Sequence, residues 1–147
     1  MPSRRLAGAV LALVALTSVA ACSGSEDAGL ATLPAAAAAP AAGAELSATD
    51  FAAASKRAGT TIIDVRTPAE FAEGHLPGAV NIDVQSPDFA ARIAQLDPGA
   101  TYAVYCRSGN RSAAALQLMQ SAGLRSAYHL GGGIGAWQAA GGEVVTG

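Results

Sequence analysis

An alternation of short apolar runs with segments of helical periodicity, from about residue 45 to the C-terminus, most constrains the fold of this chain. The runs that predict strands lie at 45–47, 60–65, 79–82, 101–105 and 127–130. The segments that predict helices lie at 49–57, 69–73, 88–96, 111–122 and 134–140. Connections this short favour a parallel sheet with helices on both faces, so the predicted fold class is α/β.

The first 22 residues predict a targeting segment. Arg4 and Arg5 precede an uncharged apolar run, 6–19, which is too short to span a membrane comfortably. The run ends in Val19-Ala20-Ala21-Cys22, which resembles a bacterial lipobox, whose cysteine is diacylated and becomes the N-terminus after cleavage. We therefore expect a lipoprotein signal peptide at 1–22 and an extracytoplasmic protein that is lipid-anchored at Cys22 to the bacterial cell membrane. An ordinary signal peptide is the alternative, and the export route stays open.

Residues 23–44 are dominated by Ala, Pro, Gly and Ser and predict a flexible tether, because they offer too little apolar surface to fold alone. The 147 residues, 51% of them apolar, suffice for one ordinary core, which assigns 45–147 to a single domain. Removal of 1–21 leaves seven basic and eleven acidic residues, a net charge of −4. This acidic balance argues against a nucleic acid partner.

One cysteine, Cys106, enters a loop between the predicted strand 101–105 and the predicted helix 111–122. The unpaired N–H groups at a helix start, together with two nearby guanidinium groups, attract an anion. Such surroundings commonly lower the pKa of a thiol to between roughly 3.5 and 7.5, so that the thiolate is present at neutral pH. Working groups also gather at the carboxyl ends of parallel strands. We therefore predict that Cys106 is a catalytic nucleophile.

The rest of this loop is predicted to bind the substrate. Its backbone amides would hold an anion, and Gly109 would permit the tight curvature that this requires. Asp64 and Arg66 end the strand 60–65 and are predicted to form a pair that supports the site. The predicted substrate-binding residues are Arg107, Ser108, Gly109, Asn110, Arg111 and Ser112.

Several motifs, taken in order and spacing, resemble the rhodanese-like domain family over essentially all of 45–145. They are Ile63-Asp64-Val65-Arg66, Glu70-Phe71, Gly74-His75-Leu76-Pro77-Gly78-Ala79, Cys106-Arg107-Ser108-Gly109-Asn110-Arg111-Ser112, Gly132-Gly133 and Trp137. The resemblance implies a five-stranded parallel sheet flanked by helices, an active-site loop that starts at the cysteine, and a persulfide intermediate on Cys106.

The expected function is sulfur transfer. Attack of the Cys106 thiolate on thiosulfate or a similar donor would give a persulfide and release sulfite, after which cyanide or a thiol removes the outer sulfur. The expected partners are therefore a small sulfur-containing anion and a thiol or cyanide acceptor, and a protein acceptor of sulfur is not identified. This chemistry requires no metal and no other cofactor.

Two other functions fit the same residues. The domain could be a non-enzymatic module that carries sulfur or docks to a partner. It could also be a phosphatase or arsenate reductase on the same scaffold. Those enzymes usually have a longer loop with an arginine six positions after the cysteine, whereas here Arg111 is five positions on and Ser112 follows. The shorter loop suits sulfur better than a tetrahedral phosphate.

Overall fold

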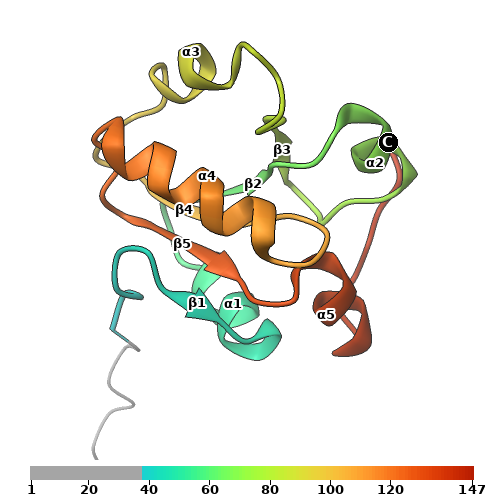
Figure 1. Ribbon diagram of the computed structural model, residues 1–147. Coiled ribbons are helices and arrows are strands. Elements are labelled where there is room, and N and C mark those ends of the chain that lie inside the picture. The colour runs from blue at the N-terminus through green and yellow to red at the C-terminus, as the bar shows by residue number, and fades with distance from the viewer. Residues whose placement is uncertain (1–37) are drawn as a thin grey trace, which may run out of the picture. The chain divides into compact units, whose positions relative to one another are not determined.

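A computed structural model of the protein describes residues 38–147 (Figure 1). The predicted signal peptide 1–22, with Cys22, and the predicted tether as far as residue 37 lie outside the described residues. Within the described part of the chain, no helix combines the length and the apolar character that crossing a bilayer requires.

The domain is built on one sheet of five parallel strands. The strands are β1 (Glu45–Leu46), β2 (Thr60–Asp64), β3 (Val80–Asn81), β4 (Thr101–Tyr105) and β5 (Ala127–Leu130). Their order across the sheet is β1-β5-β4-β2-β3, and every pairing is parallel. This arrangement confirms the predicted α/β fold class.

Helices cover both faces of this sheet (Figure 1). The helices are α1 (Ala48–Ser55), α2 (Pro68–Glu73), α3 (Phe89–Ile93), α4 (Asn110–Ser121) and α5 (Gly133–Ala139). Side chains from α3 and α4 pack in one apolar cluster, and those from α1 and α5 pack in another. Side chains of a strand alternate between the two faces. Accordingly Val104 and Cys106 belong to the first cluster, and Tyr105 belongs to the second.

The element boundaries follow the predicted ones to within two residues except at α3. The periodicity predicts a helix over 88–96, but α3 ends at Ile93. Beyond it, Gln95 and Leu96 donate to carbonyls three residues earlier, at Arg92 and Ile93. Bonds of this spacing tighten the backbone into a 3₁₀-like turn, which ends the helix before the chain enters β4.

The start of the domain is attached to β5 through backbone hydrogen bonds. The Gly43 N–H donates to the carbonyl of Ala127 at 2.7 Å, and the His129 N–H donates to the carbonyl of Ala44 at 2.8 Å. These bonds bring β1 alongside β5, so that Glu45 lies opposite His129 in the register of the sheet.

Candidate active site

Cys106 lies at the carboxyl end of the central strand β4, and three residues separate it from the start of α4 at Asn110. Only 1% of its surface is exposed. Its sulfur accepts a hydrogen bond from the Gly109 N–H at 3.1 Å. It is a free thiol, the only cysteine among residues 38–147. The strand, loop and helix therefore place this sulfur inside the turn that the loop makes before α4.

Opposing effects act on the pKa of the Cys106 thiol. Burial alone would raise the pKa, because it disfavours the charged thiolate. Hydrogen bonding by the Ser112 side chain, and by the backbone N–H groups of Ser112, Ser108 and Gly109, outweighs burial and holds the pKa below its usual value. The loop thus provides hydrogen-bond donors for a buried sulfur anion, as a backbone nest does.

Two glycines permit this geometry. Gly109 has a φ of 99°, a left-handed conformation that favours glycine. Gly133 lies against the other side of the loop, where an added Cβ would be only 2.4 Å from the Cys106 carbonyl oxygen. That oxygen accepts a hydrogen bond from the Ile134 N–H at 2.9 Å. The close approach of the 131–133 segment therefore supports the backbone of the Cys106 loop.

A buried ion pair lies at the end of β2, beside β4. Arg66 donates from Nε to both carboxylate oxygens of Asp64 at 3.0 Å, and its Nη2 donates to Asp64 Oδ2 at 2.5 Å. The same Nη2 donates to the Gly74 carbonyl at 2.7 Å. The structure thus joins the two residues that the sequence predicts as support of the site.

Tyr105, directly before Cys106, connects with this pair. Its hydroxyl accepts from the Leu76 N–H at 3.1 Å, and the Arg66 guanidinium lies 5.6 Å from the centre of its ring. Burial and the hydrogen bond with Asp64 raise the pKa of Tyr105. The sequence analysis did not identify this residue, although a polar aromatic group at the end of an apolar strand signals a hydrogen-bonding role.

A second arginine–carboxylate pair joins α4 to α2. The Arg111 guanidinium donates to the two carboxylate oxygens of Glu70 at 2.8 Å and 2.7 Å. Both side chains keep about a quarter of their surface in solvent, 26% and 21%. The hydrogen bond from Arg111 lowers the pKa of Glu70 to about 2. Arg111 therefore holds a carboxylate, which the sequence did not indicate.

Glu70 is itself fixed by the start of its helix. The Thr67 hydroxyl accepts from the Glu70 N–H at 3.3 Å, and the Thr67 N–H donates to Glu70 Oε2 at 3.1 Å. This reciprocal arrangement is a capping box, with Pro68 in the first turn. The Thr-x-x-Glu spacing was the available signal that Glu70 occupies a defined position.

Arg107 and its surroundings differ from this pair. The Arg107 side chain is exposed, and among the described residues no side-chain hydrogen bond or ion pair involves its guanidinium group. Ser108 and Asn110 are exposed as well, whereas Gly109 and Ser112 are buried.

A cavity of about 260 Å³ lies beside the loop, and Arg107 is one of the residues that line it. The lining residues are Arg66, Glu70, Glu73, Gly74, Arg107, Ile134, Gln138 and Val144.

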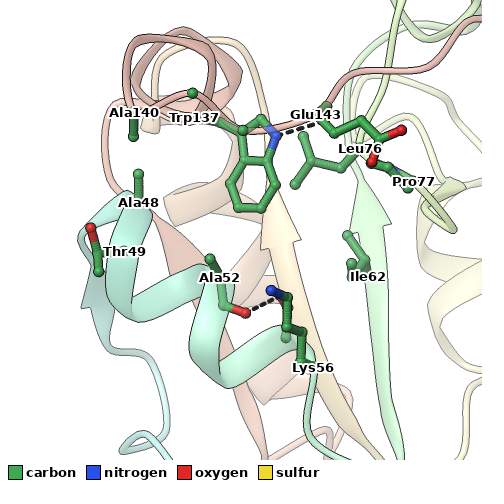
Figure 2. A pocket seen from close by; sticks show the side chains of 13 residues that line it. Ala48, Thr49, Ala52, Lys56, Ile62, Leu76, Pro77, Trp137, Ala140 and Glu143 are labelled. Atoms are coloured by element: carbon green, nitrogen blue, oxygen red, sulfur yellow. Dashed lines mark hydrogen bonds between the residues drawn. The ribbon is translucent and has the colours of Figure 1, made fainter.

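A larger cavity, of about 660 Å³, lies between α1 and the segment that follows α5, and none of residues 106–112 lines it. Figure 2 shows Trp137 on one side of this cavity, with Leu76, Pro77 and Ile62 nearby. The indole Nε1 donates to the Glu143 carbonyl at 2.8 Å. The larger cavity therefore does not lie at the Cys106 loop.

The Cys106 thiol accepts backbone hydrogen bonds at the carboxyl edge of a parallel sheet. This arrangement is typical of proteins that stabilise a cysteine anion. The model of the Rhodanese-like domain family matches residues 47–140. The chain therefore belongs to the rhodanese-like domain family, as the motifs of its sequence indicated.

Individual relatives agree with this family. The chain is 36% identical over 84 residues to thiosulfate sulfurtransferase GlpE of Pseudomonas putida, covering 57% of this chain and 74% of that protein. It is 39% identical over 80 residues to the uncharacterized Synechocystis protein slr1261, covering 54% of this chain but only 44% of that protein. A crystal structure of a rhodanese-related protein from Thermoplasma volcanium superposes with a TM-score of 0.63 and 32% identity, covering 71% of this chain and 99% of the other.

Proposed function

We propose that this protein is a sulfurtransferase in which Cys106 carries the transferred sulfur as a persulfide. The thiolate attacks the sulfane sulfur of thiosulfate, and the sulfur–sulfur bond of the donor breaks. Sulfite leaves with the bonding electron pair, and Cys106 becomes Cys–S–S⁻. A thiolate or cyanide then attacks the outer sulfur, which returns Cys106 to the thiolate form. The observation that carries this proposal is the buried Cys106 sulfur, which accepts the Gly109 N–H at 3.1 Å, and the lowered pKa of the thiol supports it.

The loop has the donors that a persulfide anion needs. The Gly109 N–H already donates to the sulfur of Cys106, and the N–H groups of Ser108 and Ser112 also lower the pKa of this thiol. Fixed donors that surround a developing negative charge stabilise it without reorganisation. The same amides would stabilise the outer sulfur once it is loaded.

Arg107 is the better placed of the two loop arginines to bind the sulfonate group of thiosulfate. Its side chain is exposed and lines the cavity beside the loop, whereas the guanidinium group of Arg111 is held by Glu70. An arginine binds an oxyanion through a fork of N–H donors. A phosphatase is disfavoured because the position six residues after the cysteine, where those enzymes usually have an arginine, is Ser112 in this chain.

A sulfur carrier is the second candidate, and the burial of Cys106 is the observation that favours it. With 1% of the residue exposed, a loaded sulfur is shielded from small acceptors. A carrier would load sulfur once from thiosulfate and keep it in the presence of cyanide. An enzyme would form thiocyanate over many turnovers.

The proposal includes attachment to the outer side of the bacterial cell membrane through a lipid on Cys22. Support comes from the lipobox-like sequence Val19-Ala20-Ala21-Cys22. Metabolic labelling with a palmitate analogue should mark the wild type and not Cys22→Ala. Equal labelling of both proteins would rule out this anchor.

The mass of the intact full-length protein after incubation with thiosulfate tests the sulfur chemistry. The wild type should gain one sulfur atom, and Cys106→Ser should gain none while its unfolding midpoint stays close to that of the wild type. Cys22→Ala is the matched control, because the sequence contains two cysteines and Cys106 remains in this variant. Sulfur gain in Cys106→Ser, or none in the wild type, would reject the proposed function.

A further inference from the structure

A chain of polar side chains leads from the buried sulfur of Cys106 to the exposed edge of the sheet. The Ser112 hydroxyl donates to the Gly109 carbonyl at 2.9 Å, the N–H of the same Gly109 donates to the Cys106 sulfur at 3.1 Å, and the Ser112 side chain helps to lower the pKa of the Cys106 thiol. The Ser112 Oγ also lies 3.2 Å from His129 Nδ1. His129 Nε2 is 3.5 Å from Glu45 Oε2, on a side chain that is 69% exposed. Glu45 of β1, His129 of β5, Ser112 of α4 and Cys106, which directly follows β4, thus form one connected series.

Ser112 is the residue in this series whose hydroxyl proton can change its acceptor. Its hydroxyl has a single proton, and three acceptors surround it. These are the Gly109 carbonyl at 2.9 Å, His129 Nδ1 when that nitrogen is unprotonated, and the sulfur of Cys106. Because Ser112 is fully buried, no water competes for the proton in place of these groups.

The protonation of His129 decides whether it is one of those acceptors. A carboxylate that faces one ring nitrogen favours the proton on that nitrogen, so Glu45 places the proton of neutral His129 on Nε2. Nδ1 then accepts the Ser112 proton. When His129 is doubly protonated, Nδ1 becomes a donor to Ser112 Oγ, and the hydroxyl proton is shared between the sulfur and the Gly109 carbonyl only.

We propose that His129 is a positioning residue that acts on Cys106 through Ser112, because it withdraws the Ser112 hydroxyl from the sulfur when neutral and releases it to the sulfur when protonated. The inference rests on the proposed function, since it concerns the reactivity of the same thiolate. An added hydrogen bond stabilises a thiolate and makes it less nucleophilic. Protonated His129 would therefore favour a stored sulfur anion, and neutral His129 would favour attack.

The surroundings of His129 determine where this change occurs on the pH scale. Burial lowers the pKa of His129, and the negative charge of Glu45 opposes this effect. The charged groups that face it are Glu45 from β1 and, through Ser112, the Cys106 sulfur. Its neighbour in register on β4 is the apolar Val104, and Arg111 of α4 is paired with Glu70. The change should therefore occur below the usual His pKa of about 6.5.

The pH dependence of alkylation of Cys106 by iodoacetamide in the full-length protein, followed by mass spectrometry on the peptide that contains Cys106 so that Cys22 does not contribute, tests this inference. The wild-type rate should show two inflections, one from Cys106 and one from His129; the His129 inflection, referred to as the lower inflection, should fall below the usual His pKa of about 6.5. A change of about one unit in thiolate basicity alters nucleophilicity about threefold, which sets the expected size of the second inflection. His129→Asn should lose the lower inflection, since the amide still reaches Ser112 but does not titrate in this range.

A double-mutant cycle separates action through Ser112 from a general effect on packing. In a Ser112→Ala protein, the further change His129→Asn should leave the rate profile as it is. His75→Asn is the matched control, because His75 is the other histidine of the chain and its Nδ1 contacts the Phe71 carbonyl instead. That variant should keep both inflections.

Glu45→Gln provides a test that does not disturb the core, because the side chain is exposed. Removal of the carboxylate should move the lower inflection to a more acidic pH. Persistence of the lower inflection in His129→Asn, or an unmoved inflection in Glu45→Gln, would overturn the inference while the proposed function stands. A single inflection at the ordinary thiol pKa of about 8.5 in the wild type would reject both.

Discussion

The two arginine–carboxylate pairs near Cys106 have the same chemistry and different surroundings. In the pair of Asp64 and Arg66, the side chains are 0% and 7% exposed. In the pair of Glu70 and Arg111, they are 21% and 26% exposed. The first pair connects the end of β2 to Tyr105 and Gly74 inside the domain, and the second connects α2 to α4 at the surface.

Burial determines how much each pair can contribute to the free energy of unfolding. Loss of one partner of a buried pair leaves a charge without compensation and costs about 3–5 kcal/mol. Exposed pairs are screened by solvent and contribute about 1 kcal/mol or less. The comparison indicates that the buried pair supports the fold under the site, whereas the exposed pair positions groups at the start of α4.

The largest effect is expected for Arg66→Ala. It leaves the Asp64 carboxylate buried without its partner and removes the donor to the Gly74 carbonyl. The free energy of unfolding, measured in urea, should fall by about 3–5 kcal/mol. A double change, Asp64→Leu with Arg66→Met, should recover part of the loss. A loss below about 1 kcal/mol in Arg66→Ala would erase the distinction between the two pairs.

Arg111→Ala should affect turnover more than stability. The loss of an exposed pair should lower the free energy of unfolding by about 1 kcal/mol or less. The kcat/KM for thiosulfate with cyanide should fall about tenfold, equivalent to about 1.4 kcal/mol of transition-state stabilisation. The expected cause is the loss of a cation near Cys106 and of the contact that positions α4 against α2.

Arg125→Ala is the matched control for this prediction. Arg125 is an exposed arginine that follows the C-terminal end of α4, whereas the Cys106 loop precedes its N-terminal end. It should leave both the urea midpoint and kcat/KM unchanged. If Arg111→Ala lowered the midpoint sharply and left the kinetics as in the wild type, the exposed pair would be structural after all.

The smallest effect is expected for the pH dependence of the stability that the pair of Glu70 and Arg111 contributes. Because the pKa of folded Glu70 is about 2, below the usual value for glutamate in an unfolded chain, the pair stabilises the fold above about pH 4.5. This contribution is lost as the pH falls toward 2. Glu70→Gln, which retains an acceptor for the capping box, should be less stable than the wild type at pH 7 by about 1 kcal/mol or less and nearly equal to it at pH 2.

Glu73→Gln supplies the comparison for Glu70→Gln on the same helix. Its carboxylate is exposed and forms no ion pair with any residue of the described domain. The free energy of unfolding of this variant between pH 2 and pH 7 should follow that of the wild type within about 0.5 kcal/mol. A constant difference between Glu70→Gln and the wild type over this range would show that the ion pair is not the cause.

Much of the fold could be predicted because local patterns carry it. The apolar runs around Ile63 and Val104 predict buried strands, and both residues lie in the first core cluster. Thr67 and Pro68 mark the start of α2, and Gly109 marks the turn into α4. Tertiary contacts were needed to define the end of α3, where turn geometry replaces a periodicity that continues for three more residues.

The site could be predicted only in part, for a similar reason. The loop sequence indicated a reactive thiol at Cys106 and donors around it. It did not indicate that Arg111 would bind Glu70, 41 residues earlier, or that Ser112 would meet His129, 17 residues later. Neither contact has a short-range sequence pattern, because each joins elements that the sheet brings together.

The sequence by itself determined the family and the parallel sheet and singled out Cys106 as the candidate nucleophile, since spacing and periodicity act along the chain. Only the tertiary structure decided which polar groups surround that cysteine, which arginine is held by a carboxylate and which one faces solvent. The physical reason is that burial and hydrogen-bond partners depend on the packing of β1, β5 and α2 around the loop, and these elements are remote from Cys106 in the sequence.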